Sequence, residues 1–221
     1  MSSPYVLYGA PGSGATSIHA ALTLFGASVM VMDVAPWQGE DQRAKLTRVN
    51  PMRQVPVLVL PTGEVTTESA AILIWLADHY PSARLAPRFG DAARGQYLRR
   101  MTFVAAEIYS LYWVRDEPSR LAQTPEAQAF VLDRTAERIA ECWRIMDAQV
   151  PRGLLYLLVD ELSVLDLYVT VVSRWQPRRL RFYREAPRMA EIVRRVDSEP
   201  RLLEHWQARY PFVGAWESEG P

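Results

Sequence analysis

The sequence predicts an α+β protein of two domains: an N-terminal domain with the element order βαβαββα, followed by an all-helical domain. Two observations support this prediction. Short β-prone runs alternate with helical runs over residues 5–80, whereas beyond the linker-like segment 81–87 the chain has helical periodicity with almost no strand signal. A length of 221 residues, 49% of them hydrophobic and 23% charged, is typical of a folded chain with one or two domains. We therefore expect domains at residues 1–82 and 83–221.

Each element of the first domain rests on a local pattern. Runs rich in β-branched and aromatic residues predict strands, and polar or amphipathic runs that end at Gly or before Pro predict helices. A Thr-Gly turn between two β-prone runs predicts that the last two strands form a hairpin. The expected order is a strand at 5–8, a helix capped by Thr16 or Ser17 and ending near Phe25, a strand at 29–34, a helix at 38–49, strands at 56–60 and 65–67, and a helix at 68–80.

The second domain is expected to consist of helices joined by loops. Apolar residues recur at helical spacing in the segments 91–117, 125–149, 163–175, 187–196 and 201–209. The segment 174–195 holds eight arginines against two glutamates, and we interpret it as a solvated helical face. Because no RNA-binding, zinc-finger or helix-turn-helix signature accompanies these arginines, we do not expect nucleic-acid binding.

Charge, cysteine and histidine usage exclude several classes of protein. The chain has 25 basic and 25 acidic residues, so no overall field would attract it to nucleic acid or anionic lipid. Cys142 is the only cysteine, which excludes an intrachain disulfide and favours a reducing compartment. The three histidines lack metal-binding spacing, and we expect no metal.

Residues 2–32 contain no Asp, Glu, Lys or Arg, but Gly and Pro interrupt this segment. We therefore expect neither a signal peptide nor a membrane span, and we expect a cytoplasmic protein.

Three short strings stand in a characteristic order along the chain. They are Asn-Pro-Met-Arg-Gln-Val-Pro at 50–56, Thr-Glu-Ser at 67–69 and Ser-Val-Leu-Asp at 163–166. The last has the spacing of a helix N-capping box, for which we expect a role in folding. With the element order, these strings resemble the cytosolic glutathione S-transferase family, in particular bacterial members with a serine-type active-site loop. The resemblance covers the whole chain and implies a thioredoxin-like first domain and a homodimer.

The resemblance implies that glutathione is a co-substrate and suggests which residues bind it. Val55, which precedes a proline expected to be cis, would pair its backbone with the cysteinyl part. The start of the following helix offers unpaired N–H groups to the γ-glutamyl carboxylate, so Glu68 and Ser69 are expected to bind this end of glutathione. Arg53 and Gln54 are expected at the glycyl end.

A transferase must also stabilise the glutathione thiolate, because a free thiol of this kind has a pKa of about 8.5. The resemblance indicates a hydroxyl just after the first strand, and we expect Ser13 to donate a hydrogen bond to the sulfur. A plain Gly-Ser turn is the alternative interpretation of Ser13. Tyr8 is the next candidate, although strand alternation could bury it, and Thr16 and Ser17 could serve if they do not simply cap the helix.

The family places its second substrate against the first helices of the second domain. Tyr109, Tyr112 and Trp113 share one helical face there, which predicts a hydrophobic electrophile pocket, although the same spacing is also typical of core packing. The resemblance therefore implies a detoxification enzyme that adds the glutathione thiolate to a small hydrophobic electrophile. Lyase, isomerase, dehalogenase and peroxidase chemistry on the same fold, or a non-catalytic partner-binding protein, are the alternatives.

Overall fold

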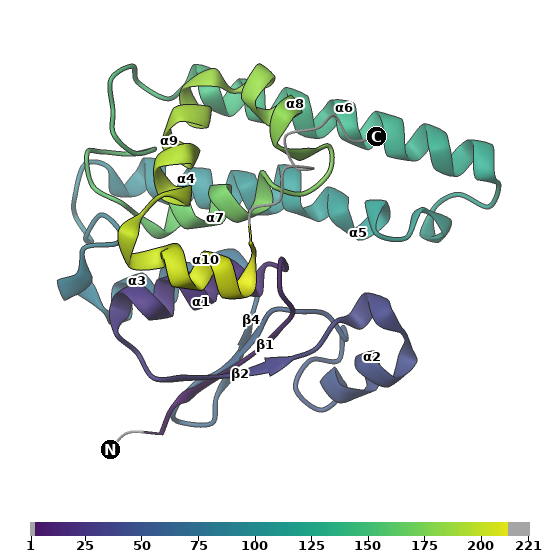
Figure 1. The fold of residues 1–221 in the computed structure, drawn as a ribbon, viewed down its shortest axis with the longest axis horizontal. Coiled ribbons are helices and arrows are strands. Elements are labelled where there is room, and N and C mark those ends of the chain that lie inside the picture. The colour runs from purple at the N-terminus through teal and green to yellow at the C-terminus, as the bar shows by residue number, and fades with distance from the viewer. Residues whose placement is uncertain (1–2, 212–221) are drawn as a thin grey trace.

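A four-stranded sheet with helices forms the first part of the chain, and a helical region follows it (Figure 1). The computed structural model describes residues 3–211. Strand β1 (Tyr5–Gly9) pairs in parallel with β2 (Val29–Asp33) and antiparallel with β3 (Val57–Val59), which pairs antiparallel with β4 (Val65–Thr67). The strand order is therefore β2-β1-β3-β4. The predicted α+β class, with a thioredoxin-like βαβαββα domain before a helical region, is confirmed.

Three helices complete the N-terminal domain. Helices α1 (Ala15–Phe25) and α3 (Ser69–His79) pack against each other between the sheet and the later helices (Figure 1). Helix α2 (Glu40–Leu46) lies apart from them over a small apolar cluster that includes Val57. It is shorter than the predicted helix at 38–49, because Gly39 has a φ of 127° and separates it from the preceding 3-10 turn.

The helical region contains seven α-helices within the described residues. They are α4 (Arg94–Phe103), α5 (Tyr112–Arg115), α6 (Pro125–Ala148), α7 (Val164–Val172), α8 (Arg178–Glu185), α9 (Pro187–Asp197) and α10 (Leu203–Arg209). The single helix predicted at 91–117 is wrong, because a π-helical turn and a 3-10 turn separate α4 from α5. Helix α8 was not among the predicted elements.

Helix α7 forms the centre of the helical region. All nine of its residues are buried, and it packs against α1, α3, α4 and α9. Its first turn carries the predicted capping box, in which the side chains of Ser163 and Asp166 each bond the other residue's backbone N–H. Within residues 3–211, no helix is both long enough and apolar enough to span a bilayer.

The arginine-rich segment is not simply a solvated face, and that prediction is wrong for two of its residues. Arg174 and Arg179 are only 2% and 0% exposed. Both pair with Asp197 at the end of α9, and Arg179 also donates to the Thr170 carbonyl oxygen at 2.9 Å. The sequence could not reveal these two ion pairs, because Asp197, which pairs with both guanidinium groups, lies on a different helix.

Helix α10 connects the helical region to the N-terminal domain through two polar contacts. On α10, His205 Nε2 lies 3.1 Å from the carbonyl oxygen of Thr16 in α1, and Arg209 forms an ion pair with Asp33 at the end of β2. His205 is 6% exposed, its Nδ1 has no hydrogen-bond partner, and its ring meets that of His19 edge-on at 4.8 Å. The α1–α10 contact therefore accommodates an uncharged imidazole.

Acidification is expected to destabilise the protein through this contact. Burial, with a smaller effect of the neighbouring His19, lowers the pKa of His205 to about 3, and burial lowers the pKa of His19 as well. Between about pH 6.5 and pH 3 the unfolded chain therefore binds protons that the folded chain does not. The free energy of unfolding should decrease as the pH decreases through this window, by up to about 1.4 kcal/mol per pH unit from His205 alone, and the lowered pKa of His19 acts in the same direction.

Urea unfolding measured between pH 7 and pH 4 checks this prediction. The variant His205→Gln should have a shallower dependence of stability on pH than wild type. The control variant His79→Gln, which changes an exposed histidine on α3, should keep the wild-type slope. An identical slope in wild type and His205→Gln would show that His205 does not cause the acid sensitivity.

Candidate active site

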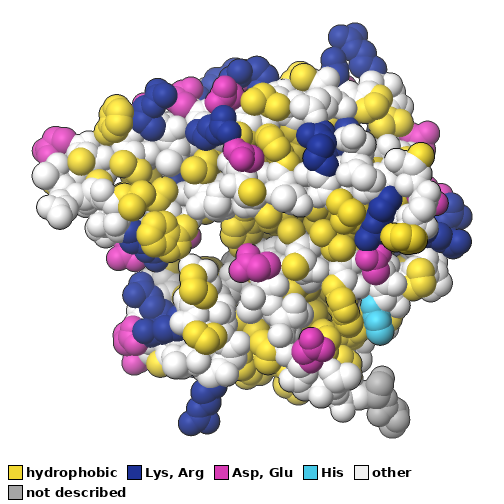
Figure 2. Space-filling model, turned by 180° about the vertical axis from the view of Figure 1, so that it is seen from behind, with side chains coloured by type: hydrophobic (Ala, Val, Ile, Leu, Met, Phe, Trp, Pro, Cys, Tyr) yellow, Lys and Arg dark blue, Asp and Glu magenta, His cyan; other side chains and the backbone are white. Residues whose placement is uncertain are grey.

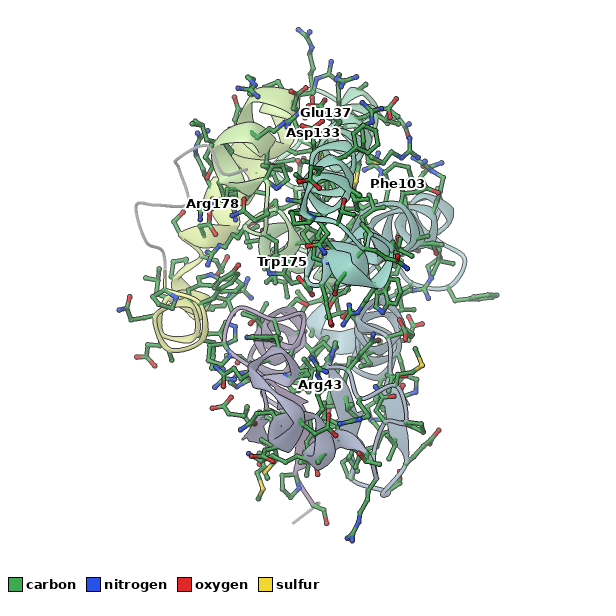
Figure 3. The ribbon with its side chains drawn as sticks, turned by 90° about the vertical axis from the view of Figure 1, so that its right-hand side faces the viewer. Arg43, Phe103, Asp133, Glu137, Trp175 and Arg178 are labelled. Atoms are coloured by element: carbon green, nitrogen blue, oxygen red, sulfur yellow. The ribbon has the colours of Figure 1, made fainter. Side chains whose placement is uncertain are left out.

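A cleft of about 1570 Å³ lies between the N-terminal domain and the helices that follow it. The surface is hollowed between these two halves in Figure 2. Arg43 borders the cleft from the N-terminal domain, while Trp175 and Arg178 border it from the helical region (Figure 3). Any ligand in this cleft would touch both halves of the molecule.

Four of the five residues predicted to bind glutathione line this cleft. They are Arg53, Gln54, Val55 and Glu68, while Ser69 is buried directly behind the rim. The Val55–Pro56 peptide bond is cis, as expected. Residues that are separate in the sequence are thus brought to one wall of the cleft by the end of β4 and the turn before β3.

The start of α3 has the features of an anion-binding site. Glu68 precedes the helix with a φ of 66° and a ψ of 105°, a conformation that costs a non-glycine residue about 1–3 kcal/mol. Ser69 is 5% exposed, and its Oγ makes no hydrogen bond of normal geometry. A strained rim residue and an unpartnered hydroxyl therefore occur together at a helix N-terminus, where N–H groups and the helix dipole favour negative charge.

Asn50 shapes the turn that carries Arg53 and Gln54. Its side chain accepts a hydrogen bond from the Met52 N–H at 3.0 Å and donates to the Gln54 carbonyl oxygen at 2.9 Å. Arg53 has a φ of 57° and forms an ion pair with Glu40. The guanidinium predicted to bind the glycyl end thus already has an acidic neighbour.

Ser13 lies just before the first residue of α1 and lines the cleft, but its hydroxyl forms hydrogen bonds to backbone groups of its own loop. It donates to the Ala10 carbonyl oxygen at 2.7 Å and accepts from the N–H groups of Ala10 and Ala15 at 3.1 and 3.3 Å. To donate to a thiol, the hydroxyl would have to leave Ala10. The role of Ser13 in thiol activation stays a prediction.

The alternative hydroxyls lie elsewhere. Tyr8 packs against the small apolar cluster under α2, and Ser17 Oγ donates to the Gly14 carbonyl oxygen at 2.9 Å. Thr16 is buried, and its Oγ1 has no hydrogen-bond partner. None of these three is among the described residues that line the cleft.

Two hydrogen bonds connect the helical region to Gly12, in the loop before α1. Trp175 Nε1 donates to the Gly12 carbonyl oxygen at 2.7 Å, and the Gly12 N–H donates to the Arg209 carbonyl oxygen at 3.0 Å. The Trp175 ring also meets the rings of Tyr109 and Tyr112 edge-on, each at 4.9 Å. The loop is therefore fixed by contacts that its own sequence does not reveal.

Tyr109, Tyr112 and Trp113 all line the cleft, although they contribute differently. Tyr112 is buried and donates to the Gln176 carbonyl oxygen at 2.7 Å, whereas Trp113 is 46% exposed and lies under the Arg120 guanidinium. Arg115 also lines the cleft, together with arginines that sequence reasoning missed: Arg43, Arg120, Arg174 and Arg178. In a chain with so many arginines, no local signal distinguishes those that face a cleft.

Gly14 is a further residue that sequence reasoning missed. Its φ of −57° and ψ of −23° are ordinary helical values, so its backbone conformation does not require glycine. A Cβ atom at this position would lie 2.4 Å from Tyr109 Oη and 2.9 Å from Ser69 Oγ. Glycine is thus required because two hydroxyls from other elements occupy the space beside it.

Gly14→Ala is therefore expected to destabilise the protein by about 1–3 kcal/mol, because the methyl group displaces a tyrosine whose ring packs against Trp175. Tyr109→Phe should relieve part of this cost, so the two substitutions should be non-additive. Thermal and urea unfolding of the single and double variants measure both effects. Gly95→Ala is the matched control: this helical glycine in α4 has open space around it, and alanine should stabilise it by about 0.5–1 kcal/mol.

A loss of stability in Gly95→Ala equal to that in Gly14→Ala would contradict the steric explanation. Exact additivity of Gly14→Ala and Tyr109→Phe would contradict the proximity of the Tyr109 hydroxyl to residue 14.

Within residues 3–211, no group of three His, Cys, Asp or Glu side chains lies close enough to hold a metal ion. Cys142 is buried on α6, and burial raises the pKa of its thiol. The described residues that line the cleft carry hydroxyls, carboxylates and guanidinium groups.

Comparison with known proteins identifies the family. The family model "Glutathione S-transferase, N-terminal domain" matches residues 3–78. The chain is 30% identical over 199 residues to the uncharacterized GST-like protein YncG of Escherichia coli (strain K12), a match that covers 90% of this chain and 95% of that protein. The chain therefore belongs to the glutathione S-transferase family.

Solved structures agree with this assignment. The structure of a sphingomonad glutathione S-transferase complexed with glutathione is 26% identical, with a TM-score of 0.74, and the match covers 94% of this chain and all (100%) of that one. A glutathione transferase homologue from Sulfitobacter with bound glutathione has a TM-score of 0.79 and covers 94% of this chain and 99% of its own. At 20% identity, this second likeness speaks for the fold alone.

Proposed function

We propose that this chain binds glutathione in the cleft and adds its thiolate to a small hydrophobic electrophile, as a glutathione S-transferase does. The start of α3 is the observation that carries the proposal. There a strained Glu68 lines the cleft of a chain that belongs to this family, and the next residue, Ser69, is buried with a hydroxyl that makes no hydrogen bond of normal geometry.

The γ-glutamyl end of glutathione carries a carboxylate and an ammonium group on one carbon atom. The Ser69 hydroxyl and the N–H groups of the first turn of α3 suit the carboxylate. The Glu68 carboxylate is exposed and forms no ion pair with another residue in the range 3–211, so it is available to the ammonium group. Both charges of this end would then be matched by neighbouring residues.

The rest of the tripeptide follows the same wall of the cleft. Val55 is half-buried at the rim, where its backbone would pair with the cysteinyl residue. Gln54 and Arg53 come next and would contact the glycyl carboxylate, for which Arg53 would share its charge between the ligand and Glu40.

The second substrate would lie on the opposite side, against Tyr112, Trp113 and Trp175. These three side chains offer aromatic surface to a small apolar electrophile, and Arg120 adds a positive charge above Trp113. A homodimer stays a prediction from the family resemblance, and a cytoplasmic location stays a prediction from the sequence.

Isothermal titration calorimetry with glutathione tests the binding site. Wild type should bind glutathione, and Glu68→Gln should weaken binding at least about tenfold, because a charge-assisted contact to the ammonium group is lost. Glu68→Gly should weaken binding similarly while leaving the free energy of unfolding unchanged or raised, since glycine adopts the positive φ without strain. The control variant Glu64→Gln removes an equal charge from the exposed β3–β4 turn and should bind like wild type.

Failure of wild type to bind glutathione would overturn the proposed function and favour a partner-binding role for the fold. Equal weakening in Glu68→Gln and Glu64→Gln would show that net charge, and not the start of α3, governs binding.

A further inference from the structure

Two hydroxyls from distant parts of the chain meet at the start of α1. Tyr109 Oη and Ser69 Oγ lie 2.4 Å and 2.9 Å from the point where a Cβ atom of Gly14 would be. Tyr109 is partly buried and lines the cleft, so its hydroxyl is close to the space where a ligand would bind. The absence of a side chain at Gly14 makes room for this hydroxyl directly at the helix N-terminus.

The backbone before Tyr109 departs from the α-helix. A π-helical turn spans Val104–Ile108, and Ile108 has a φ of −117° and a ψ of −59° before the 3-10 turn Tyr109–Leu111 begins. A π-helical turn adds a residue to the helix and changes the direction of the side chains that follow, and such turns are frequent at functional sites. The Tyr109 ring is then held edge-on against Trp175, which in turn donates to Gly12.

The position of the glutathione sulfur follows from the proposed function, on which this inference rests. With the γ-glutamyl end at Ser69 and the cysteinyl backbone at Val55, the cysteinyl side chain would point toward the wall between them. That wall is formed by the loop that ends at Gly14, with the Tyr109 hydroxyl beside it. We propose that the Tyr109 hydroxyl, supplied by the helical region, donates the hydrogen bond that stabilises the thiolate of bound glutathione.

Tyr109 is suited to donate without losing its own proton. Burial raises the pKa of Tyr109 to about 12, with the neighbouring Ser69 hydroxyl opposing the shift, and the charges of Asp116 and Glu68 adding to it. The tyrosine therefore stays protonated at neutral pH and acts as a hydrogen-bond donor, not as a base. The proton lost by the glutathione thiol goes to solvent, and no oxidant or reductant takes part.

The geometry favours Tyr109 over Ser13 for this role. The Ser13 hydroxyl already donates to Ala10 at 2.7 Å and accepts from two backbone N–H groups, so donation to sulfur would break a loop contact. The Ser69 hydroxyl lies near the Tyr109 hydroxyl beside Gly14, but Ser69 Oγ makes no hydrogen bond of normal geometry within residues 3–211. In this arrangement Ser13 shapes the loop, and Tyr109 contacts the reacting atom.

The test compares glutathione with S-methylglutathione, which cannot form a thiolate. The ultraviolet absorbance of the thiolate, titrated against pH with saturating protein, gives the thiol pKa of bound glutathione in wild type, Tyr109→Phe and Ser13→Ala. Calorimetry gives the affinity of each variant for both ligands. Tyr97→Phe is the matched control, because this buried tyrosine lies on α4 and its hydroxyl has no hydrogen-bond partner.

In Tyr109→Phe, the pKa of the bound thiol is expected to rise by at least about one unit, a tenfold loss of preference for the thiolate. The affinity for S-methylglutathione should stay within about threefold of wild type. Tyr97→Phe and Ser13→Ala should both keep the wild-type thiol pKa, and thermal unfolding shows whether each variant is folded.

An unchanged thiol pKa in Tyr109→Phe would overturn the inference, as would a raised pKa in Ser13→Ala alone. An equal loss of affinity for both ligands would also overturn it, since Tyr109 would then contact the tripeptide and not the thiolate. If wild type bound neither ligand, the proposed function itself would fail, and that result is distinct from all of these.

Discussion

The buried carboxylate of Asp166 is the interaction on which the arrangement of this protein depends. It accepts hydrogen bonds from the N–H of Leu157 and the N–H and hydroxyl of Ser163, and so fixes where α7 begins. Burial raises the pKa of Asp166 to about 6, although these hydrogen bonds oppose the shift. Such a group is tolerated in the core only with its partners in place, because an unsatisfied buried carboxylate or N–H is costly.

The position of α7 in turn determines the position of the elements that border the cleft. It packs against α1 and α3, whose N-termini border the cleft, and against α4, which leads through the π-helical turn to Tyr109. The two walls of the cleft thus pack against a common apolar helix. Trp175, just beyond α7, adds a direct hydrogen bond to Gly12 across the domain junction. Thiol chemistry at this junction would depend on both halves of the chain.

The parts of the fold that depend on local sequence were predictable. The strands, the hairpin and the capping box at Ser163 each follow from residues within a few positions of one another, whereas the cis bond before Pro56 was expected from the family resemblance. Helix α8 was missed because its sequence is dominated by arginines, and the burial of Arg179 depends on Asp197 from another helix. Periodicity also assumes a regular helix and cannot detect the π-helical turn before Tyr109.

Part of the candidate site could be anticipated from the sequence. The residues proposed to bind glutathione lie in two short strings, and four of them line one cleft in the structure. The relation of Gly14 to Tyr109 is a contact between distant segments, and nothing in either segment alone indicates it. Ser13 was chosen from its place in the loop, whereas the hydrogen bond from its hydroxyl to Ala10 is a property of the folded loop.

A crystal structure of the protein with glutathione tests the central claim most directly. The account predicts the γ-glutamyl group at the start of α3 and the sulfur within about 3.5 Å of Tyr109 Oη, with the Ser13 hydroxyl still bonded to Ala10. A sulfur atom bonded instead to Ser13, with Tyr109 turned away or bonded to the γ-glutamyl carboxylate, would contradict it.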